Sequence, residues 1–210
     1  MIFDLTLILD ENTLPFPDSG DPHMTWKHLV DHSQYKCQVS LFSMVTHIGT
    51  HVDAPLHFIK GGQTTAEIDL GRYCGPAVCL EVPDASLQKL LNIDHIMEKN
   101  RALIKPRDII ILSTGWEDRI GTAEYFQFPD FDPSIGVTLE KFGAHGIGMD
   151  LPSIDRKGDA HQSVLSRGMS IIESLVNLRP LIGKSFYFSA VPLKFRDGDG
   201  SPVRAYADLR

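Results

Sequence analysis

The sequence predicts a single α/β domain with a mixed β core flanked by a few helices. Short runs rich in β-branched and other apolar residues recur along the chain, and segments with helical spacing separate several of them. No internal repeat, low-complexity segment or linker divides the 210 residues. This length suits one domain with a substantial core, so we expect residues 1–210 to fold as one unit.

The expected strands are short apolar runs bounded by turn-forming residues. Residues 1–10 partly alternate between apolar and polar side chains, and a long loop rich in Pro, Gly and Asp follows them. The run D-I-I-I-L at 108–112 is typical of a central strand that is buried on both faces. Further strands are expected over residues 39–45, 77–82, 146–150 and 186–192.

Helices are expected between these strands. Leucine and isoleucine recur at helical spacing in the first half of residues 84–100, and His95 is expected at the surface of that helix. Shorter helices are expected over residues 138–145 and from Asp159 onward. The acidic segment 150–155 fits a turn that caps the last of these helices better than it fits a second acidic site.

Composition and charge exclude several classes of protein. An apolar content of 42% and a charged content of 22% are ordinary for a globular protein. A net charge of −7 argues against a nucleic acid partner. Cys37, Cys74 and Cys79 are odd in number and lack CxxC spacing, which indicates free thiols in a reducing compartment. Because Asp4 interrupts the N-terminus and no apolar run is long enough to cross a bilayer, we expect a cytoplasmic protein without a membrane partner.

Residues 46–58, which read T-H-I-G-T-H-V-D-A-P-L-H-F, concentrate the groups that bind metals. Three imidazoles and one carboxylate, those of His47, His51, Asp53 and His57, fall within eleven residues. A single histidine is more often an ordinary polar residue, but hydrophobic packing does not require four such groups on one short segment. Imidazole and carboxylate ligands suit zinc, iron or manganese, so the segment predicts a metal site.

The local backbone of this segment is expected to be extended but bent. Alternating β-branched residues and Pro55 disfavour a helix, and in an extended chain His47, His51 and Asp53 face the same side. Gly49 lies between the two histidines and would leave room for an ion. At about 3.3 Å per residue the two histidines would lie roughly 13 Å apart, which is too far for one ion. We therefore expect a bend near Gly49.

Residues 159–178 hold a second pair of candidate ligands, His161 and Glu173. In a continuous helix their twelve-residue separation corresponds to a rise of about 18 Å and a turn of about 120° beyond whole turns, so the two side chains could not share an ion. Gly168 can end a helix in the left-handed conformation and let residues 169–173 return toward its start. The spacing allows the two residues to meet but does not require it.

Two motifs carry a family resemblance. H-I-G-T-H-V-D-A-P-L-H resembles the H-x-G-[TA]-H-x-D-x-P-x-H signature of the cyclase-like metal-dependent hydrolases, whose best-known members are bacterial kynurenine formamidases. The downstream D-L-P-S-I-D, His161 and the I-I-E that ends in Glu173 resemble the second motif of that family, including the twelve-residue interval. The T-G-W turn at 114–116 and the glycine-rich tail near residue 200, which the family places near its site, agree with softer family patterns.

The resemblance implies a partly barrel-like β core and a dinuclear metal site. In that arrangement His47 and His51 hold one divalent ion, His161 holds a second, and Asp53 and Glu173 bridge the pair. Two ions per chain are expected, zinc first and manganese as the alternative. A mononuclear site, with the remaining groups beside it, is the competing arrangement.

The chemistry implied by the resemblance is hydrolysis of a C–N amide bond, of the arylformamidase type that acts on N-formylkynurenine. Bound metal ions lower the pKa of water and so supply hydroxide, and His57 matches the acid/base histidine of the family. The competing role of His57 is to orient Asp53. Alternative functions are hydrolysis of a cyclic amide or lactone, as in isatin hydrolases, and metal binding without catalysis. Glu173 favours the formamidase-like branch, because the isatin-hydrolase pattern carries glutamine there.

The resemblance also bears on the pocket and on assembly. Phe16 stands where the formamidases usually carry tryptophan, so the resemblance does not decide the identity of the substrate. Phe16 is expected to supply an apolar wall of the pocket. Trp116 is expected either at the substrate or in the core. A small-molecule substrate and a homo-oligomer, a dimer or tetramer whose loops complete the neighbouring pocket, are further implications of the family.

Overall fold

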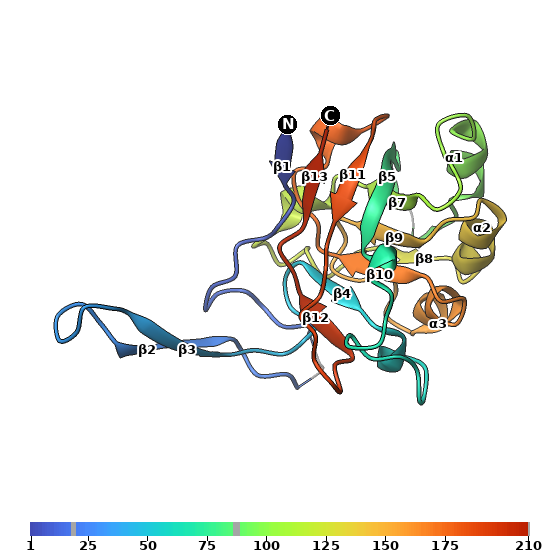
Figure 1. The fold of residues 1–210 in the computed structure, drawn as a ribbon. Coiled ribbons are helices and arrows are strands. Elements are labelled where there is room, and N and C mark those ends of the chain that lie inside the picture. The colour runs from blue at the N-terminus through green and yellow to red at the C-terminus, as the bar shows by residue number, and fades with distance from the viewer. Residues whose placement is uncertain (18–19, 86–88, 210) are drawn as a thin grey trace.

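The computed structural model describes residues 1–17, 20–85 and 89–209. Its core is a curled sheet of nine strands, so the expected mixed and partly barrel-like core is confirmed (Figure 1). From one edge to the other the strands are β1 (Ile2–Asp4), β13 (Tyr206–Asp208), β11 (Ser185–Ser189), β5 (Cys74–Glu81), β7 (Ile109–Ser113), β9 (Gly146–Met149), β10 (Ser170–Glu173), β4 (His51–Asp53) and β12 (Gly200–Pro202).

The middle of the sheet is parallel and its flanks are antiparallel. Strands β5, β7, β9 and β10 run parallel to their neighbours in this group. On one side β11, β13 and β1 continue the sheet in antiparallel fashion, and on the other side β4 and β12 do so. Strand β7 is buried along its whole length, as the apolar run in its sequence predicts.

Three helices lie together on one side of the sheet (Figure 1). They are α1 (Asp94–Lys99), α2 (Ile135–Lys141) and α3 (Asp159–Leu165). Because side chains alternate along a strand, Ile110 and Leu112 pack into the core beneath these helices, whereas Ile109 and Ile111 pack into a second core on the opposite face. Short 3-10 turns occur at η1 (Pro55–His57), η2 (Leu70–Arg72), η4 (Trp116–Arg119) and η5 (Arg179–Leu181).

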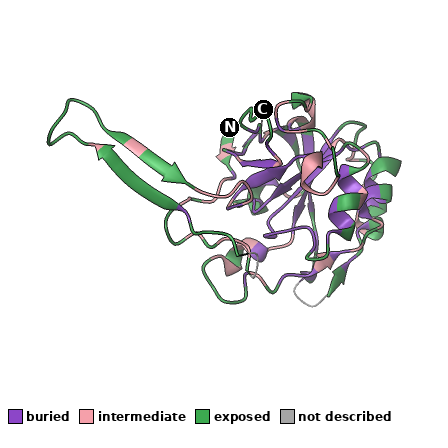
Figure 2. Ribbon diagram, turned by 90° about the horizontal axis from the view of Figure 1, so that it is seen from below, coloured by how far each residue is buried: buried purple, intermediate pink, exposed green. Residues whose placement is uncertain are grey.

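Two small strand pairs lie outside the main sheet. Strands β2 (Thr25–Val30) and β3 (Val39–Ser43) form an antiparallel hairpin that projects from the body of the domain and is largely exposed (Figure 2). Strands β6 (Leu90–Leu91) and β8 (Asp130–Phe131) form a short parallel pair. Within the described ranges no helix combines the length and the apolar character needed to cross a bilayer.

Most of the expected elements are present. The strands expected over residues 77–82, 108–112, 146–150 and 186–192 correspond to β5, β7, β9 and β11. The first strand covers only Ile2–Asp4 of the expected residues 1–10. The helix expected over 138–145 is α2, which starts three residues earlier and is followed by Gly143 in the left-handed conformation, with φ +69°.

One expectation about secondary structure was wrong. The helix expected over residues 84–100 is confined to α1, because Leu90–Leu91 form β6 and pair with β8, which buries Leu91. Residues 86–88 of that segment lie outside the described residues. The strand expected over residues 39–45 is confirmed as β3, which pairs with β2 in the projecting hairpin and not with the main sheet. For residues 90–91, pairing with the distant strand β8 decided the outcome.

The bend expected near Gly49 is confirmed, but the reason for the glycine differs from the expectation. Gly49 has φ +57°, and the chain turns there before it enters β4. A Cβ atom at this position would lie 2.4 Å from Cδ2 of Leu9. The space beside Gly49 is therefore occupied by the Leu9 side chain and is not left for an ion.

We expect Gly49→Ala to lower the free energy of unfolding by about 2 kcal/mol, because it combines a strained φ with a contact that the Leu9 side chain must move to relieve. Gly61 provides the matched control, since its φ of +74° is similar but its Cβ would meet no atom within 4 Å. Gly61→Ala should cost only about 1 kcal/mol. Urea unfolding of both variants measures the difference, and equal losses would show that Leu9 does not restrict this position.

Candidate metal centre

The register of the main sheet brings the two motifs together. Strand β4 pairs antiparallel with β10, which places His51 directly opposite Glu173 and Asp53 opposite Ile171. The Nε2 atom of His51 lies 3.4 Å from Oε2 of Glu173 and 3.5 Å from Oδ1 of Asp53. Residues 120 positions apart in sequence therefore share one buried site at the edge of the sheet.

Helix α3 brings His161 to the same place. Gly168 has φ +68° and follows the end of α3, so the chain reverses into β10 as expected. The Nε2 atom of His161 lies 3.4 Å from Oε1 of Glu173 and 3.6 Å from Oδ2 of Asp53. The sequence left the meeting of His161 and Glu173 open, and the structure brings the two residues together.

These distances fit a metal better than a hydrogen-bonded network. Ligand atoms about 2.0–2.1 Å from a tetrahedral ion lie about 3.4 Å from one another, close to the observed separations. Within the described part of the chain, two buried side-chain atoms have no hydrogen-bond partner, Nε2 of His51 and Oδ2 of Asp53. Such orphaned atoms are costly unless something else satisfies them, so the donor set fits divalent ions.

His47 and His57 lie at the more open side of the cluster. The Nδ1 atom of His47 is 2.9 Å from Oδ1 of Asp53, and its Nε2 atom is 3.2 Å from Oδ2 of Asp199. The ring of His57 stacks on that of His47 with centroids 3.7 Å apart. His57 is held loosely by polar groups, since its Nδ1 atom is 3.9 Å from Oδ2 of Asp199. The structure thus brings all five predicted ligands and His57 together.

Several groups that orient the cluster could not be found from the motifs. Nδ1 of His51 donates to the carbonyl oxygen of Gly49 at 2.8 Å, which turns the ring so that Nε2 is directed at the carboxylates. The Tyr73 hydroxyl donates to the carbonyl oxygen of Asp53 at 2.7 Å. Asp199 lies within the glycine-rich tail, between Gly198 and Gly200, and the family pattern of this tail was the one indication that the segment lies near the site. These contacts fix the positions of the candidate ligands.

Asp155 lies in the turn that was expected to cap α3, and its carboxylate contacts the His161 ring. Its Oδ2 atom accepts a hydrogen bond from the backbone N–H of Ala160 at 3.1 Å, which agrees with the capping role. Its Oδ1 atom also lies 2.5 Å from Nδ1 of His161. The neighbouring Asp150 instead accepts from the backbone N–H groups of Thr114 and Trp116. Asp155 is therefore a positioning residue, and Asp150 is a structural one.

We expect Asp155→Ala to weaken binding of the ion beside His161 by about 10- to 100-fold, because the imidazole would lose the partner that sets its tautomer and orientation. Competition with a chromophoric chelator measures the affinity. Asp159→Ala, an exposed aspartate in the first turn of the same helix, is the matched control and should bind the metal as the parent does. Equal affinities for all three proteins would remove Asp155 from the site.

In the metal-free cluster, burial and nearby carboxylates shift the pKa values of the histidines in opposite directions. Burial lowers the pKa of His47, but hydrogen bonds to Asp199 and Asp53 outweigh it and raise the value to about 10. Burial likewise lowers the pKa of His161, and Asp155 and Glu173 raise it to about 10. Burial lowers the pKa of His57 below its ordinary value, since its opposing carboxylate interactions are weaker. His57 is thus the ring of these three that is neutral near pH 7.

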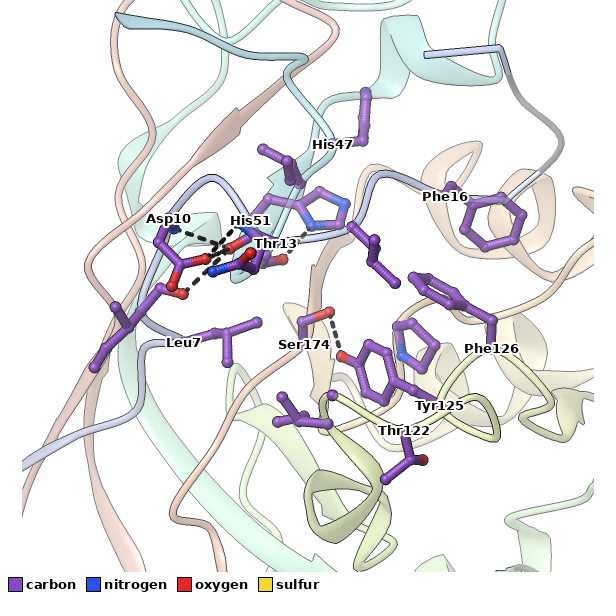
Figure 3. A pocket seen from close by; sticks show the side chains of 18 residues that line it. Leu7, Asp10, Thr13, Phe16, His47, His51, Thr122, Tyr125, Phe126 and Ser174 are labelled. Atoms are coloured by element: carbon purple, nitrogen blue, oxygen red, sulfur yellow. Dashed lines mark hydrogen bonds between the residues drawn. The ribbon is translucent and has the colours of Figure 1, made fainter. Parts of the chain in front are cut away.

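A cavity of about 390 Å³ opens beside the cluster, within the size range of small-molecule sites (Figure 3). His47 and His51 form part of its wall, and Phe16 lies across the cavity from them. The Phe16 ring makes edge contacts with Phe126, with centroids 5.9 Å apart. Trp116 is instead buried in the core, where its Nε1–H donates to the carbonyl oxygen of Tyr125. Of the two aromatic candidates, Phe16 therefore lines the cavity.

Fold and site together define an α/β protein with clustered candidate metal ligands. Residues 3–156 match the family model described as "Putative cyclase", and the chain belongs to this family.

Related proteins agree with this assignment. The kynurenine formamidase of Geobacillus thermodenitrificans (strain NG80-2) is 32% identical over 207 residues, which are 96% of this chain and 94% of that protein. Isatin hydrolase A from Labrenzia aggregata superposes with a TM-score of 0.85 at 26% identity, covering 99% of this chain and 93% of that one. A "potential metal-dependent hydrolase with cyclase activity" has a TM-score of 0.80 at 24% identity over 100% and 98% of the two chains, which shows the shared fold.

Proposed function

We propose that this protein is a metal-dependent hydrolase of C–N amide bonds, of the arylformamidase type. The observation that carries the proposal is the buried cluster of histidines and carboxylates, in which two atoms lack hydrogen-bond partners, beside a cavity of small-molecule size whose wall includes His47 and His51. The similarity to a kynurenine formamidase over nearly the whole chain supports this choice of bond.

The cluster would hold two divalent ions, zinc or manganese. His47 and His51 would serve the first ion and His161 the second, and each oxygen of Asp53 and of Glu173 lies toward a different histidine, as bridging carboxylates require. When bound, such ions lower the pKa of water and polarise the substrate carbonyl.

His57 would move the protons of the reaction. Its imidazole is partly exposed beside the cluster, and its lowered pKa keeps the ring neutral and able to accept a proton from water. The protonated ring then donates to the amine nitrogen as the C–N bond breaks, which yields formate and an aryl amine. Stacking on His47, with ring centroids 3.7 Å apart, would keep the imidazole beside the cluster.

The aryl part of the substrate would lie in the cavity. Phe16 and Phe126 supply an apolar wall opposite the candidate ligands, and the cavity can hold a single aromatic ring with a short side chain. Phe16 in place of tryptophan reduces the aromatic surface that is offered to the ring.

The test is hydrolysis of N-formylkynurenine by metal-stripped protein during titration with zinc or manganese. We expect formate release to return and to saturate near two ions per chain. Saturation near one ion would support the mononuclear arrangement. Metal binding without formate release would contradict the formamidase assignment.

A second function, hydrolysis of a cyclic amide such as isatin, is favoured by the structural similarity to isatin hydrolase A. The same titration with isatin, followed by its loss of absorbance, separates the two. An enzyme that opens isatin faster than it cleaves N-formylkynurenine would belong to this second class.

We also propose that the chain forms a homo-oligomer through the β2–β3 hairpin. The hairpin exposes several large apolar side chains, and Trp26 stacks on Phe42 there with ring centroids 5.7 Å apart. A two-stranded hairpin is marginally stable alone, so a second copy of the chain is the partner that would cover it. The cytoplasm is the proposed compartment, supported by three cysteines that form no disulfide.

We expect the double variant Trp26→Ser, Phe42→Ser to dissociate this oligomer, because it removes the aromatic pair at the hairpin. Light scattering coupled to size-exclusion chromatography should give a multiple of 23.4 kDa for the parent and 23.4 kDa for the variant. Val137→Ser, an exposed apolar residue on α2, is the control. A parent of 23.4 kDa would contradict the proposal.

A further inference from the structure

The cavity beside the candidate metal centre is largely apolar, but two buried hydroxyl groups lie at its inner end. Tyr125 is 8% exposed and Ser174 is 4% exposed, and both line the cavity. The other polar residues of the wall, apart from the histidines, belong to its exposed rim. There Asp10 and Thr13 bond to one another, and the Thr122 hydroxyl donates to the carbonyl oxygen of Arg119.

Both hydroxyl groups are held by contacts to other elements. The backbone of Tyr125 accepts a hydrogen bond from Nε1–H of Trp116 at 2.7 Å. Ser174 donates its backbone N–H to Leu151 at 2.9 Å and accepts at its carbonyl from the Thr50 hydroxyl at 2.6 Å. Ser174 has φ +56°, a conformation that a serine adopts only when its surroundings enforce it. The serine hydroxyl is thus placed in the cavity by the fold.

One of the two hydroxyl protons of this pair is not used in the hydrogen bond between them. The Tyr125 hydroxyl donates to Oγ of Ser174 at 3.0 Å (Figure 3). Each hydroxyl has one proton to donate, and one hydrogen bond between them uses only one of the two. Within the described part of the chain, the Ser174 hydroxyl has no acceptor for its own proton. A buried donor without an acceptor is costly, so the inner end of the cavity is suited to a ligand group that accepts a hydrogen bond.

The position of Ser174 indicates which ligand group this is. Ser174 directly follows Glu173, and adjacent Cα atoms are about 3.8 Å apart. A group bound by Ser174 would therefore be only a few bonds from an amide that is placed at the metal centre. Phe16 and Phe126 line the same cavity as Ser174 and His51, so an aromatic ring packed against them would lie near both points.

We propose that Ser174, supported by Tyr125, is a specificity residue that selects aryl amides carrying a carbonyl group ortho to the scissile amide. The inference rests on the proposed amide hydrolase function and goes beyond it by assigning the selection of the ortho substituent to this hydroxyl pair. The Ser174 hydroxyl donates to the ortho carbonyl oxygen, while the Tyr125 hydroxyl holds Oγ of Ser174 in place.

The experiment compares two substrates, formanilide and its 2-acetyl derivative, through the ratio of their kcat/KM values. Each value is normalised to the rate of hydrolysis by hydroxide in solution, which removes the intrinsic reactivity of the acetyl compound. We expect the parent to prefer the acetyl compound. The ratio should fall by about tenfold in Ser174→Ala and Ser174→Gly, and by a smaller factor in Tyr125→Phe, where the serine hydroxyl remains.

The two serine variants separate the effect of losing the hydroxyl from the effect of backbone strain. Glycine accepts a φ of +56° without strain and alanine does not, yet both lack the hydroxyl. Equal losses of the ratio in both support the proposal. A loss in Ser174→Ala that is absent from Ser174→Gly would assign the effect to backbone strain and overturn it.

The control is Tyr206→Phe, which removes a tyrosine hydroxyl on β13, away from the cavity, and should keep the parent ratio. An unchanged ratio in both serine variants, with both formanilides still cleaved, overturns the specificity role but leaves the hydrolase function intact. If the metal-loaded parent cleaves neither formanilide, the proposed function fails and the specificity role fails with it.

Discussion

Replacement of Asp53 by asparagine is expected to abolish both metal retention and activity. Asp53 is fully buried, and its two carboxylate oxygens lie toward different candidate ligands, His51 and His161. Asparagine keeps the size of the side chain but removes its charge and turns an amide N–H₂ toward one of these positions. A loss of several kcal/mol of electrostatic stabilisation corresponds to a fall in kcat/KM of about 10³-fold or more.

Metal analysis and kinetics on the same preparation measure this effect. The metal content per chain should fall below that of the parent, and kcat/KM for N-formylkynurenine should fall with it. Asp159→Asn makes the same chemical change at an exposed position on α3 and should leave both unchanged. Full metal content in Asp53→Asn would contradict a bridging role for this carboxylate.

Replacement of His57 by alanine is expected to separate catalysis from metal binding. His57 stacks on His47 but makes only a 3.9 Å contact with Asp199, so the other groups of the cluster remain in place without it. Metal content should stay at the parent level. The rate constant kcat should fall by about 10²- to 10⁴-fold, the contribution typical of a general acid or base.

His95→Ala is the control for this change, because His95 is an exposed histidine on α1. A lowered metal content in His57→Ala would make His57 a ligand. A fall in kcat smaller than about tenfold would leave His57 only the role of orienting its neighbours.

Local sequence patterns predicted the buried strands of the main sheet but not every element of the fold. The apolar runs that became β5, β7 and β9 were visible because a strand that is buried on both faces needs apolar residues throughout. Leu90–Leu91 were assigned to a helix and form β6, because pairing with β8 outweighed a weak helical pattern. The strand over residues 39–43 was expected, but its place in a projecting hairpin with β2 was not, since no local pattern states whether a strand joins the main sheet.

For the candidate site too, the sequence predicted what lies within one short segment but not what meets across the fold. His47, His51 and Asp53 could be proposed together because they lie on one short segment whose β-branched residues and glycine determine its local path. Residue types also showed which chemistry the segment suits. The nearness of His161 to Glu173 could only be allowed, since it depends on how the chain reverses at Gly168 and how β10 pairs with β4.

The sequence by itself determined the kinds of candidate ligand, their spacing within each motif and the class of metal chemistry that they suit. Only the tertiary structure decided that the two motifs meet, that Asp155 and Asp199 orient the histidines, and that the Ser174 hydroxyl lies in the cavity. The physical reason is that spacing within a short segment follows from local backbone geometry. Contacts between distant segments follow from strand register and core packing, which involve the whole chain at once.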